Sequence, residues 1–493
     1  MLNYRSNLER PFRVLVAMVA VCAFWMSIGT APAAEPRQVA ADMAKQYATE
    51  LEKLAAWCDE QGLAEQAAET RRRTKPAAPD LIRVPILPDE VGKASALTED
   101  TPEKIAEWHK RFWKLRHDQA QKYFQYAAQV IRSGHASLAI DLVHRAIVED
   151  PDNAAARRLL GYHDYKGRWC TPYEVNKYRS GQVWDDRFGW IRKKYLPRYE
   201  QGERFYRGKW ITAEQDKRIH GNIHNGWDIE TEHYQIRTNH SIEAGVRLGK
   251  KLEELYDVWR RLFLSFHATP RQIESMFSRR GGRVSPKQYK IVYLHSRNEY
   301  NQALRGAMPN IDKSEGVYVA QMHRVYCFDG TDTSEETLLH EATHQLFHES
   351  RRVANDVGES ANCWVVEAIA VFMETLRKQD DFYVVGGFDV QRMRAARYRL
   401  LHDKFYIPFD QLTRYGFNQL QNDPKIRTIY SQIAGWGQFL IFYDNGRYRD
   451  VMIDYLTAVY DGSQDPTILS RLSRTSYDQL DRQYHEFIEQ IKP

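Results

Sequence analysis

The sequence has few cysteines. Of the five, Cys22 lies in an apolar segment near the N-terminus, and the others are Cys58, Cys170, Cys327 and Cys363. Their spacing excludes a zinc knuckle. Four cysteines in an exported protein allow disulfides with three possible pairings. We consider one of them, a bridge between Cys327 and Cys363, as a brace for the candidate site near Cys363.

The sequence also lacks a strong charge of one sign. The formal net charge is +5, and the first 34 residues contribute +2 of it through Arg5, Arg10 and Arg13 against Glu9. The remaining +3 is spread over some 460 residues, a field too weak to indicate a nucleic-acid partner. The one local basic cluster, 71–75, is expected to be a solvated helix end.

Long hydrophobic runs are absent after the N-terminus. The longest early run, Val14 to Ile28, has 15 residues, whereas a helical span needs about 20. Basic residues precede this run, and the small-residue pattern Ala31-Pro32-Ala33-Ala34 follows it. This order predicts a signal peptide over 1–34 and export to the periplasm or the outside of the cell. An uncleaved N-terminal membrane anchor is the alternative.

The rest of the composition is that of a folded chain of several domains. Hydrophobic residues make up 43%, charged residues 27% and aromatic residues 12% of the 493 residues. We predict a mostly helical α+β protein. The expected segments are a helical segment with a linker (35–102), a helical hairpin (103–162), a Gly-x-Trp repeat region (163–226) and a C-terminal domain (227–493).

The N-terminal half is predicted to be helical. Ala40 to Arg73 has a helical pattern, and a Pro-containing linker is expected from Lys75 to Glu103. Within 104–162, Ala139, Ala146 and Pro151 have the spacing of a tetratricopeptide (TPR) helix pair, which suggests a protein partner. An ordinary helical hairpin is the alternative.

An internal repeat follows. Residues 161–171 recur 41 residues later as 202–212, with a shared frame of an aromatic residue, a basic residue, Gly, a basic residue, Trp, any residue and Thr. A glycine at a fixed place between aromatic residues predicts a tight turn with the tryptophan packed back on a small core. We expect a structural role for both copies.

The C-terminal domain begins with strand-like patterns. Trp227 to Thr238 alternates as a strand does, and Ser241 to Phe266 has the three- and four-residue steps of a long amphipathic helix. Tyr289 to Leu294 is predicted to be a strand, and Gly316 to Phe328 is a β-rich run. Helices are expected after it.

One motif has the spacing of a metal site. His340-Glu341-Ala342-Thr343-His344 places two imidazoles four residues apart, so on a helix they lie on one face and can bind one Zn²⁺. Glu341, beside the first histidine, can then take a proton from metal-bound water. Thr333 and Glu336 are expected to form a capping box at the start of this helix.

Catalytic zinc usually takes a third protein ligand. His348 continues the same helix but rises about 6 Å beyond His344. Glu349 and Glu359 are possible ligands. Glu367 is a better candidate, because it lies in the apolar run Trp364 to Met373, where a carboxylate is costly to bury unless it is paired or binds a metal. Pairing with an arginine is the alternative.

These motifs resemble the gluzincin branch of zinc metallopeptidases, through His340-Glu341-x-x-His344 and Trp364-x-x-Glu367-x-x-Ala370. Residues near 227–443 also resemble a bacterial exported family that has a peptidase-like fold and no assigned function. That resemblance covers just under half of the chain and rests on a few further segments, namely Thr231-Glu232-His233-Tyr234, Leu339 to Phe347 and Tyr430-Ser431-Gln432.

The resemblance implies a zinc site with His340, His344 and Glu367 as ligands, and Gly316 to Phe328 as the edge strand beside the cleft, where a peptide can bind. It implies a hydroxyl from Tyr430 near the scissile carbonyl, although a packed helix aromatic is the alternative. Val371 stands where related enzymes have an aspartate that orients a ligand histidine, so that partner is not evident in the sequence.

The expected function is therefore hydrolysis of a peptide or protein substrate by zinc-activated water, with Glu341 as the general base. One alternative is an inactive zincin-like protein that binds a partner through its helical repeats. A weaker alternative is hydrolysis of a non-peptide amide at the same site.

Overall fold

The computed structural model describes residues 36–74, 78–91, 97, 100–277, 287–330 and 335–491. The predicted signal peptide (1–34) and Thr333 of the predicted capping box lie outside these residues. The described chain is mostly helical with small sheets, which confirms the α+β class. None of its helices has the length and apolarity to cross a membrane. The chain divides into two compact units after Tyr47, and the larger unit, which begins at Ala48, contains all the sheets.

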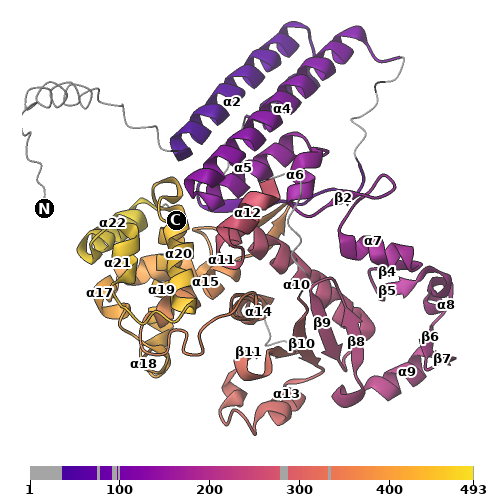
Figure 1. Ribbon diagram of the computed structural model, residues 1–493, viewed down its shortest axis with the longest axis vertical. Helices are drawn as coiled ribbons and strands as arrows, with labels where there is room; N and C mark the ends of the chain where they lie inside the picture. The colour runs from indigo at the N-terminus through magenta and orange to yellow at the C-terminus, as the bar shows by residue number, and fades with distance from the viewer. Residues whose placement is uncertain are drawn as a thin grey trace, which may run out of the picture. The chain divides into compact units, whose positions relative to one another are not determined.

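A helical hairpin, formed by the long α4 and the shorter α5, is the main feature of the N-terminal part (Figure 1). Helix α4 packs along α5, and α5 is buried over most of its length. With 28 residues, α4 is long for one arm of a 34-residue TPR unit, so the TPR resemblance stays a prediction. The helices of this part are α2 (Pro36–Glu60), α3 (Ala64–Arg72), α4 (Glu103–Val130), α5 (Ala136–Glu149) and α6 (Ala154–Leu159).

The segment predicted to be a linker contains a strand instead. Strand β1 (Leu81–Pro85) pairs antiparallel with β14 (Phe382–Gly386), which also pairs with β13 (Arg377–Gln379). Val84 of β1 is fully buried in the main hydrophobic core. The linker prediction was therefore wrong for this stretch, because the partner that makes it a strand lies some 300 residues later.

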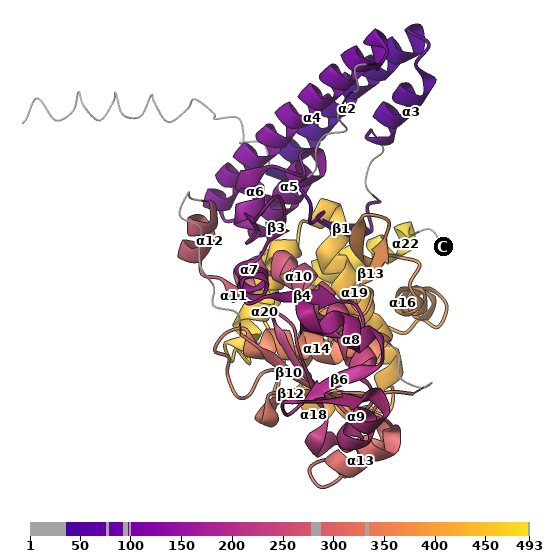
Figure 2. The same ribbon diagram turned by 90° about the vertical axis from the view of Figure 1, so that its right-hand side faces the viewer.

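The repeat region consists of three hairpin–helix units, here called the arm (residues 163–226; Figure 2). The two predicted copies are the first and third units. The middle unit has a longer turn without the basic–Gly–basic frame, so the sequence pattern missed it. The units are β2 (His163–Asp164), β3 (Trp169–Cys170) and α7 (Pro172–Arg179); β4 (Gln182–Asp185), β5 (Gly189–Arg192) and α8 (Leu196–Glu200); and β6 (Glu203–Tyr206), β7 (Lys209–Thr212) and α9 (Ala213–His220).

A five-stranded mixed sheet in the order β11-β12-β10-β9-β8 forms the framework of the C-terminal part. The predicted single strand 227–238 is a hairpin, because Glu253 of α10 accepts hydrogen bonds from the Thr231 hydroxyl and the His233 backbone and holds the turn between β8 and β9. The strands are β8 (Trp227–Glu230), β9 (Tyr234–Thr238), β10 (Tyr289–Leu294), β11 (Gly316–Val319) and β12 (Arg324–Phe328).

The sheet separates two groups of helices. Helices α10 (Ile242–Leu262) and α14 (Glu335–Glu349) contact the strands on one face, and α13 (Arg297–Leu304) contacts β10 and β12. Strand β12 alternates accordingly: Val325 and Cys327 belong to the main core with α10 and α14, whereas Tyr326 and Phe328 pack with α13. As expected, α10 begins after Ser241, whose side chain accepts from the Ala244 amide. It ends at Leu262, before α11 (Leu264–His267).

Helices make up the remainder. Helix α15 (Cys363–Met373) packs between α14 and the long α19 (Ile426–Gly446). The others are α12 (Pro270–Phe277), α16 (Gln391–Leu401), α17 (Phe409–Leu412), α18 (Phe417–Gln421), α20 (Arg449–Tyr460), α21 (Ile468–Ser473) and α22 (Tyr477–Gln490).

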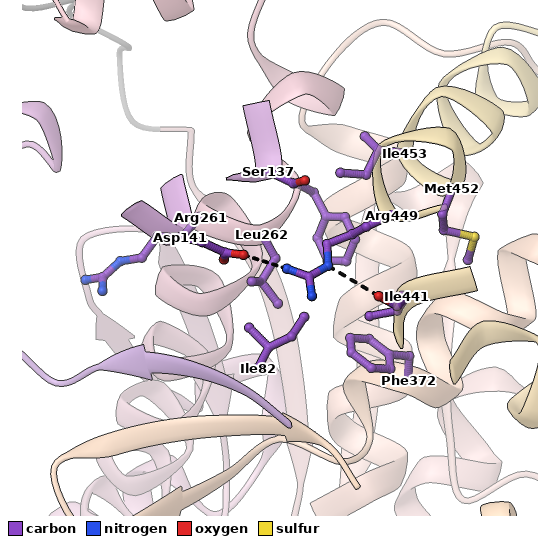
Figure 3. Close-up of a pocket in the computed structure, with 11 residues that line it drawn as sticks. Ile82, Ser137, Asp141, Arg261, Leu262, Phe372, Ile441, Arg449, Met452 and Ile453 are labelled. Carbon is purple, nitrogen blue, oxygen red and sulfur yellow. Dashed lines mark hydrogen bonds and ion pairs between the residues drawn. The ribbon is translucent and has the colours of Figure 1, made fainter. Parts of the chain in front are cut away.

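The helical hairpin is joined to the C-terminal helices around a small cavity (Figure 3). Arg449 of α20 donates to the Asp141 carboxylate of α5 at 2.7 Å and to the Ile441 carbonyl at 3.5 Å. Ile82 of β1 and Phe372 of α15 line the same cavity. Residues far apart in the sequence thus share one core, and the hairpin is part of the same folded body as the C-terminal helices.

Candidate metal centre

Helix α14 presents the two predicted histidines together. The Nε2 atoms of His340 and His344 lie 3.0 Å apart. The opposite face of the helix is anchored in the core by Leu339, Leu346 and Phe347, which are at most 1% exposed. Because the two histidines are four residues apart, both rings project from the same face of α14. The buried apolar side chains on the opposite face hold the helix in this orientation.

Glu367 approaches the two rings from α15. Its Oε2 lies 3.4 Å from His340 Nε2 and 3.8 Å from His344 Nε2. These three residues are a group whose ligand atoms all lie within 4.8 Å of one another. The helix packs closely on α19 because α19 has a glycine at the contact: a Cβ on Gly437 would lie 3.2 Å from the Ala368 carbonyl oxygen.

Glu341 faces the edge strand of the sheet. Its Oε2 accepts a hydrogen bond from the backbone N–H of Tyr318 in β11 at 2.7 Å. Gly316 allows the strand to approach α14, because a Cβ there would lie 3.2 Å from Thr337 and 3.6 Å from the Glu341 Cγ. The predicted edge strand over 316–328 is in fact two strands. Strand β11 is at the edge of the described sheet, whereas β12 lies inside it between β11 and β10.

One ligand histidine has a partner that the sequence did not reveal. His340 Nδ1 lies 2.8 Å from Glu374 Oε1, and Arg392 of α16 donates to both carboxylate oxygens of Glu374, at 2.7 and 3.1 Å. Glu374 is two helical turns after Glu367, so it lies on the same side of α15. A carboxylate on Nδ1 holds that nitrogen protonated, so Nε2 is the ring nitrogen that faces Glu367 and His344 and would bind a metal once its proton is lost.

Tyr430 also belongs to this cluster. It lies on α19, its hydroxyl accepts from Gln421 Nε2 at 3.1 Å, and it forms a hydrogen bond with Glu367. Burial raises the pKa of Tyr430, and the Glu367 carboxylate raises it further. The hydroxyl therefore stays protonated and can donate.

The electrostatics of the cluster are those of a buried acidic pocket. Burial disfavours a charged His340, but hydrogen bonds to Glu367 and Glu374 outweigh it and raise the His340 pKa to about 10. Burial opposes ionisation of Glu367, yet the His344 and His340 rings lower its pKa to about 2. Burial lowers the pKa of His344 to about 4 and raises that of Glu341 to about 7. Negative charge around His340 is what a cation would also require.

The other candidate ligands lie elsewhere. Glu349 is ion-paired with Lys287 at 3.1 Å and accepts from Gln345. His348 contacts the Tyr318 hydroxyl through Nδ1 at 3.2 Å. The Glu359 backbone lies against Gly416, away from the group of three ligands.

The cysteines do not brace the site. Cys58, Cys170, Cys327 and Cys363 are all free and buried, so the considered bridge between Cys327 and Cys363 is not formed. Cys327 instead lies near the Val292 carbonyl within the sheet. Cys363 begins α15, where burial raises its pKa. Without a disulfide, the packing of α15 against α14 and α19 holds it in position.

Two imidazoles and one carboxylate are a donor set of catalytic zinc sites, and the oriented His340 ring fits that role. The donor chemistry of His340, His344 and Glu367 therefore suits a divalent cation. In comparisons with known proteins, no family model and no curated protein matches the chain.

Proposed function

We propose that this protein is an exported zinc metallopeptidase, of a zincin-like type, that hydrolyses a peptide or protein substrate. His340, His344 and Glu367 would be the zinc ligands, and Glu341 the general base. The observation that carries the proposal is the convergence of three ligand atoms from α14 and α15 within 4.8 Å, with the Glu341 carboxylate close enough to interact electrostatically with His340 and Glu367. The gluzincin-like spacing of the sequence supports it.

The residues around the cluster have distinct parts in this proposal. Bound Zn²⁺ would polarise the scissile carbonyl and activate a water. Glu341 takes the proton of that water at its carboxylate and passes it to the leaving amine. Strand β11, at the edge of the described sheet, would offer backbone groups to an extended peptide, while the Tyr318 N–H holds the Glu341 carboxylate in place. The Tyr430 hydroxyl, which donates to Glu367 in the structure, would turn to donate to the developing oxyanion when Glu367 binds the metal.

The test is Glu341→Gln. We expect zinc content to stay near one per chain while cleavage of casein falls by about 100-fold or more, because the proton acceptor is removed and the ligands stay. Glu336→Gln is the matched control, since this residue is exposed on the same helix. Equal cleavage by wild type and Glu341→Gln would contradict the assignment.

A second outcome would favour a different class of protein. If the wild-type chain binds zinc but cleaves neither casein nor a peptide library, the domain is better described as a binding or scaffold protein that uses its helical hairpin. Activity confined to small amides would point to a non-peptide hydrolase.

A further inference from the structure

The arm has a charge that the rest of the chain does not share. Residues 163–226 contain 14 Lys and Arg against eight Asp and Glu, a net charge of +6. The whole chain has a net charge of +5, so all other residues together sum to −1. The weak average field seen in the sequence therefore conceals a concentration of positive charge on three consecutive structural units.

Many of these cations have no carboxylate partner. Six of the 14 form ion pairs, for example Arg198 with Glu203 at 2.5 Å. Within the described part of the chain, the other eight have no ion pair, and all eight are exposed. They are spread over the three units: Lys166 and Arg179; Arg192, Lys193 and Lys194; and Arg207, Lys209 and Lys217.

Aromatic rings hold several of these cations in place. Lys166 and Arg179 lie 5.3 and 5.8 Å from the centre of the Tyr165 ring. In the next unit, Arg192 and Lys194 lie 5.9 and 5.4 Å from the Tyr195 ring. An aromatic ring supports the side chain without cancelling its charge. The repeated unit is thus built to display positive charge.

Two of the cations occupy an unfavourable backbone position. Lys166 and Arg207 precede the turn glycines of the first and third units, with φ of 59° and 46°. Asn is the usual residue at this position, and a left-handed conformation is unfavourable for other residues that have a Cβ. The basic residues at these two turns place positive charge at the exposed ends of the first and third hairpins.

We propose that the arm binds an acidic polysaccharide, a linear chain with carboxylate or sulfate groups. Three consecutive units that each expose unpaired cations suit a repeating polyanion, because several weak contacts along one chain add up. The choice of a glycan rests on the expected export of the protein and is independent of the proposed hydrolysis.

The packing of the arm disfavours two other partners. The Trp190 ring is surrounded edge-to-face by Tyr173, Tyr178 and Trp184, and an Arg198 guanidinium covers the Trp210 ring at 3.9 Å. These rings therefore do not form the free stacking platforms that single-stranded nucleic acid uses. Among the large hydrophobic side chains of the arm, Phe205 is the one that is exposed, at 38%, which gives little apolar surface to insert into a membrane.

The experiment compares charge-reversal variants of the full chain. We expect Arg192→Glu/Lys193→Glu/Lys194→Glu to lower the affinity for polygalacturonate about tenfold or more at low salt, because the contacts are ionic. The matched control is Lys104→Glu/Lys110→Glu/Lys122→Glu, three exposed lysines of α4. We expect its affinity to stay within about twofold of wild type. Arg207→Glu/Lys209→Glu/Lys217→Glu is a second arm variant, in case the first fails to fold.

The proposal is overturned if wild type does not bind polygalacturonate at low salt, or if the α4 control loses as much affinity as the arm variants. Tighter binding to duplex DNA of matched charge, or to vesicles of phosphatidylglycerol, overturns the assignment of the glycan class. Because the readout is binding, it is separate from the zinc content and casein cleavage that test the proposed function.

Discussion

At the scale of single residues, the His340–Glu374–Arg392 chain has a measurable consequence. Glu374→Gln keeps the size of the side chain but removes the charge that orients His340 and accepts from Arg392. We expect zinc affinity to fall by about 10- to 100-fold, measured by competition with a chromophoric chelator. Glu336→Gln serves as the control. Unchanged affinity in Glu374→Gln would remove this residue from the metal centre.

Another residue-scale prediction concerns acid stability. His267 is half-buried and stacks on Trp259, with Nε2 2.9 Å from the Arg260 carbonyl, and desolvation lowers its pKa from 6.5 to about 4. Between these values the unfolded chain binds the proton and the folded chain does not. The stability that the uncharged His267 allows is therefore fully present above pH 6.5. As the pH falls from 6.5 towards 4, the free energy of unfolding decreases by up to about 3 kcal/mol.

The variant His267→Gln should therefore lose less stability than wild type between about pH 7 and pH 4, measured by urea unfolding at each pH. His163→Gln, a change at an exposed histidine, should follow wild type. If the free energy of unfolding of His267→Gln falls with decreasing pH as steeply as that of wild type, the prediction is contradicted.

At the scale of elements, the contact of α15 with α19 positions a metal ligand. Gly437→Val places a branched side chain where a Cβ already lies 3.2 Å from the Ala368 carbonyl oxygen. We expect a loss of about 1–3 kcal/mol in the free energy of unfolding and weaker zinc binding, because α15 must move and Glu367 moves with it. Gly306→Val, at a glycine with open space around it, should leave zinc binding unchanged.

The same scale shows what the sequence could predict. The helix with His340 and His344 follows from local periodicity, and Glu367 stood out because a charge in an apolar run needs a partner. Glu374 and Arg392 were missed because their pairing joins two helices and has no local pattern. The hairpin at 227–238 was missed because its turn, Thr231 to His233, contains no Gly, Pro, Asn or Asp, although the buried positions change phase there, from 227 and 229 to 234 and 236.

At the scale of the whole molecule, the pairing of β1 with β14 joins two segments some 300 residues apart in the sequence. Val84→Asp should lower the free energy of unfolding by about 3 kcal/mol, since it would bury an unpaired charge in the core shared with the C-terminal helices. Arg83→Gln, on the exposed face of the strand, should change it by no more than about 0.5 kcal/mol. If Val84→Asp changes the free energy of urea unfolding only slightly, β1 does not contribute to the stability of the core and behaves as a linker.

The pairing of Leu81 with Gly386 also determines when β1 can fold during synthesis of the chain. During synthesis, β1 leaves the ribosome long before β14 exists, so its ladder must wait for most of the chain. Contacts between residues so far apart in the sequence form slowly, and proteins rich in such contacts have low folding rates. We therefore expect a nascent chain truncated before residue 382 to be degraded readily by protease, and resistance to appear only once β14 has emerged.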